Sequence, residues 1–140
     1  MKTFLLSIFA VLSLCVLAPS VMFAQSGTST SSPQPELNNG RKWKANQETT
    51  TAIRNMMQLV QSHSGENIES YRALKGKLQK ELQYIFQNCS MKGKAHDQLH
   101  SYIVPLRDLI KQLDQDELSE LRKSKAGLEA HLSRYATIFE

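Results

Sequence analysis

The stretch KAHDQLHSYIVPLRDLIKQL, residues 94–113, decides the fold class of this chain. Its core-forming side chains recur at alternating steps of three and four residues: His96, Leu99, Ile103, Leu106, Ile110 and Leu113. Such steps return to one face of an α-helix, whereas a half-buried strand would alternate at every second residue. The stretch therefore predicts one amphipathic helix, in which Pro105 removes a backbone donor and bends the helix near its middle.

Three other stretches, residues 46–64, 67–88 and 114–139, show the same helical spacing. Each places its apolar side chains on one face, as a helix does when it packs against a core. The predicted core positions are Ile53, Met56 or Met57, and Val60; Tyr71, Leu74, Leu78, Leu82 or Glu81, Ile85 and Cys89; and Leu118, Leu121, Leu128, Leu132, Tyr135 and Phe139. Together with the first stretch, they predict four amphipathic helices.

Side chains typical of helix starts support two of the predicted boundaries. Asn46 is a predicted N-cap, because a short polar side chain can accept a hydrogen bond from a free backbone N–H, and Glu48 follows in the first turn. In DQDE, residues 114–117, Asp114 is the predicted cap of the fourth helix and Glu117, three residues on, is its partner.

Four such helices joined by links of a few residues predict an all-α fold. An antiparallel up-down four-helix bundle is the expected arrangement, because a short link folds each helix back along the one before it. This domain is predicted to cover residues 41–140. The alternative is a three-helix arrangement to which the first helix is loosely attached.

Residues 1–24 are predicted to be a secretory signal peptide. Lys2 gives a basic start, Phe4–Leu17 is almost wholly apolar, and small residues follow. Cleavage is expected after Ala24, with a cut after Ser20 as the second choice. An uncleaved membrane anchor is the alternative, since the apolar stretch could just span a bilayer. The chain is thus expected to be exported to the periplasm or the extracellular space, with no stable membrane insertion after processing.

Residues 25–40, QSGTSTSSPQPELNNG, are predicted to form a disordered leader rich in Ser, Thr and Pro. Leu37 is the only large apolar side chain in this segment. Such a segment cannot bury enough surface to offset its chain entropy. It is expected to act as a flexible tether for the domain that follows.

The charge of the chain indicates no nucleic-acid surface. Without Lys2, the sixteen remaining Lys and Arg residues and the thirteen Asp and Glu residues give a net charge of +3. The basic residues between 72 and 80 are flanked by Glu69 and Glu81. Interleaved charges of both signs are typical of a solvated helix face rather than a basic patch.

The stretch QNCSMKGKAHDQLH, residues 87–100, collects potential metal ligands. Cys89 is the only cysteine left after the predicted cleavage, so it has no partner for an internal disulfide. His96 and His100 are four residues apart and share one helix face. Together with Met91 they give one thiol, one thioether and two imidazoles, which predicts a transition-metal site.

The donor types favour copper. Thiolate and thioether are soft ligands that select Cu(I), while imidazole suits Cu(I), Cu(II) and zinc. Zinc is the second choice, because it would use the thiolate and both imidazoles without the thioether. The bundle topology is expected to bring Trp43, His131 and Tyr135 to the same end, around the ligands.

Two segments carry a resemblance to known proteins. GRKWKAN, residues 40–46, and CSMKGKAHDQLH, residues 89–100, resemble segments of a group of small secreted bacterial helical proteins with no assigned activity. The likeness covers about residues 39–140 and implies a signal peptide, a Trp-Lys start and a Cys-x-Met-x-Gly-x-x-His-x-x-Leu-His segment, but no catalytic role. The residues it singles out are Trp43, Cys89, Met91, Gly93, His96 and His100.

No enzyme is predicted from these motifs. HDQLH, residues 96–100, lacks the glutamate of the His-Glu-x-x-His zinc peptidases. Cys89 and His96 are a conceivable nucleophile and base, but the sequence indicates no third group to orient them. Carriage, buffering or sensing of a metal ion is therefore the predicted function, with a metal-handling envelope protein as a partner.

Two other functions compete with metal binding. A b-type-cytochrome-like haem site would use Met56 or Met57 and His131, but Met56 lies about 15 Å along its helix from Asn46 at about 1.5 Å per residue. That height differs from the height expected for His131, so haem is disfavoured. The other alternative is a metal-free helical interaction module of the cell envelope, in which Cys89 is merely buried.

We expect the exported protein to begin at Gln25, because the apolar segment ends in Ala24 and polar chain follows at once. Mass analysis of the N-terminus of the exported protein measures this directly. An intact Met1 on a membrane-embedded form would contradict both the cleavage site and the predicted location.

Overall fold

The computed structural model describes residues 34–140, so the predicted signal peptide, residues 1–24, and residues 25–33 of the predicted leader lie outside the described part. Five helices occur in the described part, and the last is a single turn. They are α1 (Gln47–Ser62), α2 (Ile68–Asn88), α3 (Gly93–Lys111), α4 (Leu118–Ser133) and α5 (Tyr135–Ile138). The prediction of an all-α fold is confirmed.

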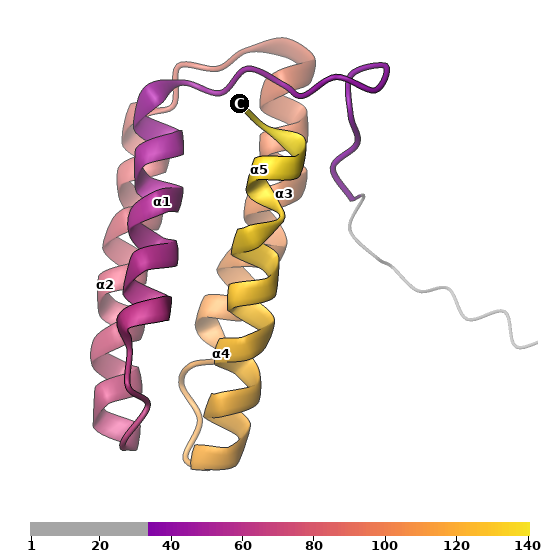
Figure 1. The fold of residues 1–140 in the computed structure, drawn as a ribbon. Coiled ribbons are helices and arrows are strands. Elements are labelled where there is room, and N and C mark those ends of the chain that lie inside the picture. Colours follow the sequence, from indigo (N-terminus) through magenta and orange to yellow (C-terminus); the bar gives the residue numbers. More distant parts are fainter. Residues whose placement is uncertain (1–33) are drawn as a thin grey trace, which may run out of the picture.

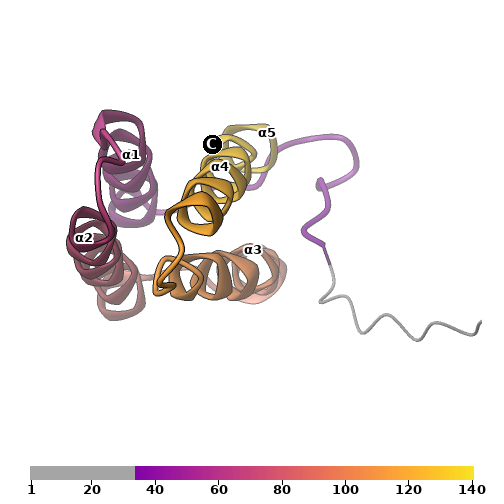
Figure 2. The same cartoon turned by 90° about the horizontal axis from the view of Figure 1, so that it is seen from below.

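The four long helices lie side by side in a bundle-like arrangement (Figure 1). Seen along their length they occupy four corners, with α1 packed against α2 and α4, and α3 also packed against α2 and α4 (Figure 2). The three-helix alternative is wrong, because α1 buries Ala52, Met56 and Val60 completely in the common core. No helix within residues 34–140 is long and apolar enough to cross a bilayer.

Most of the predicted apolar positions form the core, but the predictions for Cys89, His96 and Leu118 are wrong, because these side chains are only partly buried at its edge. At the positions left open by the sequence, Met56 is buried in preference to Met57, and Leu82 in preference to Glu81. The helix that carries Pro105 continues through it to Lys111 and buries five apolar or aromatic side chains. Each helix is therefore held by its apolar face rather than by contacts within the helix alone.

The predicted cap of the fourth helix is wrong. Glu117, not Asp114, occupies the N-cap position of α4, and its side chain makes no capping hydrogen bond. The Asp114 carboxylate instead accepts a hydrogen bond from Lys75 Nζ on α2 at 2.6 Å, which lowers the pKa of that carboxyl. The Asp114 carboxylate thus pairs with an ammonium group of α2, whereas the local sequence predicted that it would accept a hydrogen bond from the backbone at the start of α4.

The predicted end of the fourth helix is also wrong. After α4 and the single turn of α5, Phe139 adopts an extended backbone and forms a β-bridge with Trp43. The Trp43 N–H donates to the Ile138 carbonyl, and the Glu140 N–H donates to the Trp43 carbonyl, both at 2.9 Å. Backbone partners from the segment before α1 therefore replace the partners that a continuing helix would supply.

The end of the predicted leader is hydrogen-bonded to the domain. The Glu36 N–H donates to Gln98 Oε1, and the Trp43 indole N–H donates to the Glu36 carbonyl, both at 2.6 Å. Arg134 donates to Gln34 Oε1 at 2.8 Å. The chain is thus attached to the helices well before the start of α1.

One end of the bundle gathers segments that are far apart in the sequence. The segment before α1, the α2–α3 connection and the C-terminus all lie there (Figure 1), and we call it the terminal end. The Asn46 side chain also donates to the Asn88 carbonyl at 3.0 Å, which joins the start of α1 to the end of α2. His63, in the α1–α2 connection, lies at the opposite end.

We expect Phe139→Ala to lower the free energy of unfolding by about 3 kcal/mol, a typical cost of truncating a buried phenylalanine. Phe139 is 2% exposed, and its ring stacks on Tyr135 with centroids 5.0 Å apart. Phe86→Ala is the matched control, since Phe86 is 56% exposed and should change stability by no more than about 0.5 kcal/mol. Urea unfolding followed by circular dichroism measures both. A loss of stability in Phe139→Ala as small as the one expected for Phe86→Ala would contradict the structural role of Phe139.

Candidate functional site

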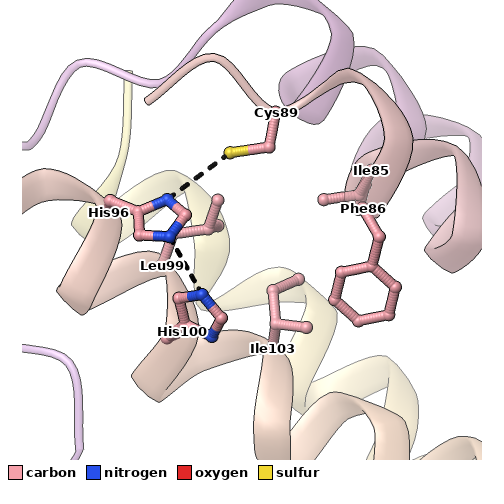
Figure 3. Close-up of a pocket in the computed structure, with 7 residues that line it drawn as sticks. All are labelled: Ile85, Phe86, Cys89, His96, Leu99, His100 and Ile103. Carbon is pink, nitrogen blue, oxygen red and sulfur yellow. Dashed lines mark hydrogen bonds between the residues drawn. The ribbon is translucent and has the colours of Figure 1, made fainter. Parts of the chain in front are cut away.

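The terminal end contains a hollow of about 250 Å³ between the last turns of α2 and the first turns of α3. It is lined by Ile85, Phe86, Cys89, His96, Leu99, His100 and Ile103 (Figure 3). Most of this lining is apolar, and the polar groups are one thiol and two imidazoles. The structure thus brings together three of the four predicted metal ligands.

The α2–α3 connection places Cys89 beside α3. Cys89 follows the last residue of α2 and has an extended backbone, while its N–H still donates to the Ile85 carbonyl at 2.9 Å. Gly93, the first residue of α3, has φ of +60°, a conformation that glycine adopts without the strain a side chain would add. The chain therefore turns sharply after Cys89, whose side chain remains half-buried against the core.

The three polar side chains form a short chain of contacts centred on His96 (Figure 3). Cys89 Sγ lies 3.8 Å from His96 Nδ1, and His96 Nε2 lies 3.0 Å from His100 Nε2. The two imidazole rings meet edge to face, with centroids 4.5 Å apart. If His96 Nδ1 accepts a hydrogen bond from the thiol, its Nε2–H is the donor to His100.

The Cys89–His96 contact and the His96–His100 contact are each short enough for their two donor atoms to bind the same metal ion. Zinc lies about 2.3 Å from a thiolate and about 2.0 Å from an imidazole nitrogen, so a sulfur and a nitrogen less than about 4.3 Å apart can bind one ion of this size. The pair of Cys89 Sγ and His96 Nδ1 meets this condition at 3.8 Å. The two Nε2 atoms of His96 and His100 meet the corresponding condition at 3.0 Å.

The three donors do not point at one ion. The sulfur lies on the Nδ1 side of the His96 ring, and His100 lies on its Nε2 side. Accordingly, no group of three or more His, Cys, Asp or Glu side chains within residues 34–140 is arranged to hold a metal. A metal bound without rearrangement of His96 would take two donors from these side chains.

Met91, the fourth predicted ligand, lies in the same connection but does not line the hollow. Its side chain is half-buried and packs against the hydrophobic core. Trp43 is also directed elsewhere, since its indole N–H donates to the Glu36 carbonyl. Neither side chain makes a hydrogen bond to the Cys89–His96–His100 chain within the described residues.

His131 has a structural partner. Its Nε2 donates to the Tyr102 carbonyl at 3.0 Å, and its ring stacks on the Tyr102 ring with centroids 4.5 Å apart. Burial lowers the pKa of His131, the nearby Arg134 lowers it further, and the hydrogen bond to the Tyr102 carbonyl opposes the shift. His131 is therefore held as a neutral donor that joins α4 to α3.

Tyr135 packs at the terminal end beside α1. Its hydroxyl lies 3.0 Å from Thr50 Oγ1, and its ring stacks on Phe139. Burial raises the pKa of Tyr135, and the nearby Cys89 raises it further. Tyr135 does not line the hollow.

Sequence reasoning missed two features of this site. Phe86, the exposed wall of the hollow, is a large apolar residue outside the buried stripe of α2 and three residues before Cys89, and that position was the available signal. The contact of His100 with His96 was also missed, since spacing showed only that both lie on one face. His100 is therefore a group that can orient the His96 ring beside Cys89, and the sequence did not indicate such a group.

Comparisons with known proteins assign no family to this chain. It has no significant match among protein-family models, curated proteins or solved structures. The function of the site is therefore argued from the geometry of its side chains.

We expect the free energy of unfolding to fall as the pH drops below about 6.5, partly because of His131. Its pKa in the folded protein lies below the ordinary value of 6.5, so the unfolded chain takes up the proton first. The stability that neutral His131 contributes is complete above that ordinary value and is lost as the pH falls below it. The His131→Gln variant keeps a donor for the Tyr102 carbonyl but cannot titrate. Urea unfolding at several pH values should show a shallower slope for this variant, and an identical slope would contradict the assignment.

Proposed function

We propose that this protein is an exported antiparallel up-down four-helix bundle that binds a soft transition-metal ion, most favourably Cu(I), at its terminal end. Its role would be carriage, buffering or sensing rather than catalysis. The observation that carries the proposal is the 3.8 Å separation of Cys89 Sγ and His96 Nδ1, within reach of one ion. The up-down assignment is supported by the short connections and by the packing of each long helix against its sequence neighbours.

Cu(I) fits this donor pair better than zinc does. A thiolate is a soft ligand that selects Cu(I), and Cu(I) is stable with few ligands. Structural zinc sites use four protein ligands, whereas Cys89 and His96 supply two. Met91, two residues after Cys89, is the nearest additional soft donor along the chain, and we keep it in the proposal as a further Cu(I) ligand.

His100 is proposed to orient His96. A metal-binding histidine usually donates its second ring N–H to a partner that fixes the tautomer and the ring orientation. The 3.0 Å contact between the two Nε2 atoms supports this role, because it leaves His96 Nδ1 directed at the sulfur. His100 then stabilises the site without binding the ion.

The other two candidate functions are supported less by the geometry. An interaction module is favoured by Phe86 and Tyr84, which are 56% and 44% exposed on α2. A haem site would require Met56, which is completely buried among apolar side chains, and His131, whose Nε2 is bonded to the Tyr102 carbonyl. A metal-handling envelope protein remains the proposed partner, on the basis of the predicted export.

We expect the reduced protein to bind one equivalent of Cu(I), and Cys89→Ala and His96→Gln each to lose stoichiometric binding. His100→Leu should weaken binding about tenfold, the effect typical of removing a partner of a ligand, while His100→Gln retains an acceptor for His96 and should restore it. Met91→Leu should weaken binding of Cu(I) but leave zinc unchanged, because a thioether is soft. Competition with a chromophoric Cu(I) chelator measures all five variants.

His63→Gln is the matched control, because His63 lies in the α1–α2 connection, which is at the opposite end of the bundle from the α2–α3 connection. It should bind Cu(I) as the unchanged protein does. Binding should also raise the thermal midpoint, since affinity for the folded state adds to stability. Equal, weak binding by the unchanged protein and Cys89→Ala would favour the interaction module instead.

A further inference from the structure

The Cys89–His96–His100 chain also has the arrangement of an activated nucleophile. A thiol lies beside an imidazole nitrogen, and the second nitrogen of that ring is held by a third group. Nucleophilic sites are recognised by this order of nucleophile, base and orienting group rather than by sequence position. The chain of contacts opens into a hollow whose other walls are apolar, where a reactant could bind.

We propose that Cys89 is a nucleophilic thiol that undergoes exchange with small disulfides bearing an aromatic or other apolar arm. His96 acts as the base through Nδ1, and His100 holds the His96 ring through the two Nε2 atoms. The product is a mixed disulfide on Cys89 whose added arm lies in the hollow. This activity is separate from metal binding, because it requires no ion.

The exchange is balanced without any other reactant. The Cys89 proton passes to His96 Nδ1, and the thiolate attacks one sulfur of the disulfide along the S–S axis. A bond forms between Sγ and that sulfur while the original S–S bond breaks. The departing thiolate takes the proton from His96 and leaves as a free thiol. Cys89 is thereby oxidised, and one half of the disulfide is reduced.

The hollow indicates the class of disulfide. Its apolar wall is formed by Ile85, Leu99 and Ile103, which are almost completely buried, and Phe86 borders it from an exposed position. An enclosed apolar cavity of about 150 Å³ accommodates benzene. A hollow of about 250 Å³ therefore has room for one aromatic ring beside the sulfur. Nothing in this lining pairs with a charged arm except the two histidines.

The charged side chains nearest to Cys89 in the sequence do not line the hollow. Lys94 and Asp97 line a different hollow, together with Trp43 and Glu36, and Lys92 is exposed. Neither lysine makes an ion pair within the described residues. The groups that contact the sulfur or lie beside it in the hollow are therefore His96, His100 and the apolar side chains of its walls.

The test measures exchange rates in metal-free protein kept in a chelator. Dipyridyl disulfide is the aromatic probe and hydroxyethyl disulfide the hydrophilic one, and each rate is divided by the rate for the same chain unfolded in urea. We expect this ratio to be about ten or more for the aromatic probe, below the roughly hundredfold that a fully positioned base contributes. The hydrophilic probe should give a smaller ratio, because it shares the contribution of His96 as the base but gains nothing from the apolar hollow. A ratio near one for both probes would overturn the proposal.

Variants identify the groups responsible. His96→Gln should lose the excess rate, because it removes the nitrogen that accepts the Cys89 proton. His100→Leu should lose most of the excess rate, while His100→Gln, which can still accept from His96 Nε2–H, should recover it. His63→Gln is the distal control and should behave as the unchanged protein does. Circular dichroism confirms that each variant is folded.

Further outcomes test the roles of Phe86 and His96 and separate disulfide exchange from metal binding. Phe86→Ala should lower the ratio for the aromatic probe and leave the hydrophilic probe unchanged. An excess rate that survives His96→Gln, or an equal loss in His63→Gln, would overturn the assignment of His96 as the base. Because the chelator removes metal, a protein that binds Cu(I) tightly but shows no excess rate would contradict only this proposal and leave the metal site intact.

Discussion

Burial of four apolar stripes in one core is the constraint on which the rest of this structure depends. Helices of 16 to 21 residues in a protein take most of their stability from packing of the apolar face, so each needs that face covered by the others. Met56, Leu78, Leu106 and Leu128, one from each long helix, are completely buried. Once these stripes face one another, the rotation of every helix is set, and with it the direction of the side chains at the terminal end.

The candidate site is a consequence of that rotation. Ile85 on α2 and Leu99 on α3 are buried in the core, and the residues beside them along each helix then lie at the edge of the core. Cys89 is one turn beyond Ile85, and His96 is one turn before Leu99. The short α2–α3 connection closes the distance, so a half-buried thiol meets an imidazole without any strand or loop dedicated to the purpose.

Metal binding and disulfide exchange would compete for the same sulfur. A thiolate that binds Cu(I) cannot attack a disulfide, and a mixed disulfide on Cys89 has no thiolate to offer a metal. Both proposals use His96 through Nδ1 and His100 as the group that orients it. The geometry that favours one therefore favours the other, and the state of the site would depend on which reactant it meets first.

The sequence by itself determined the helical class, most of the buried positions and the residues of the candidate site. Steps of three and four residues are a local property of the helix, so Leu99, Ile103 and Leu106 could be placed in a core before any tertiary contact was known. The same reasoning placed Cys89 and His96 at one end of the domain.

Only the tertiary structure decided how those residues are used. Periodicity places a side chain on a helix face, but it does not show which nitrogen of His96 lies beside the sulfur. It also does not show that His100 contacts the other nitrogen of the same ring. It also assigned Asp114 to a helix start, whereas the carboxylate pairs with an ammonium on α2. The physical reason is the same in each case: hydrogen bonds and ring orientations depend on groups brought close from other helices, and spacing along one helix carries no information about them.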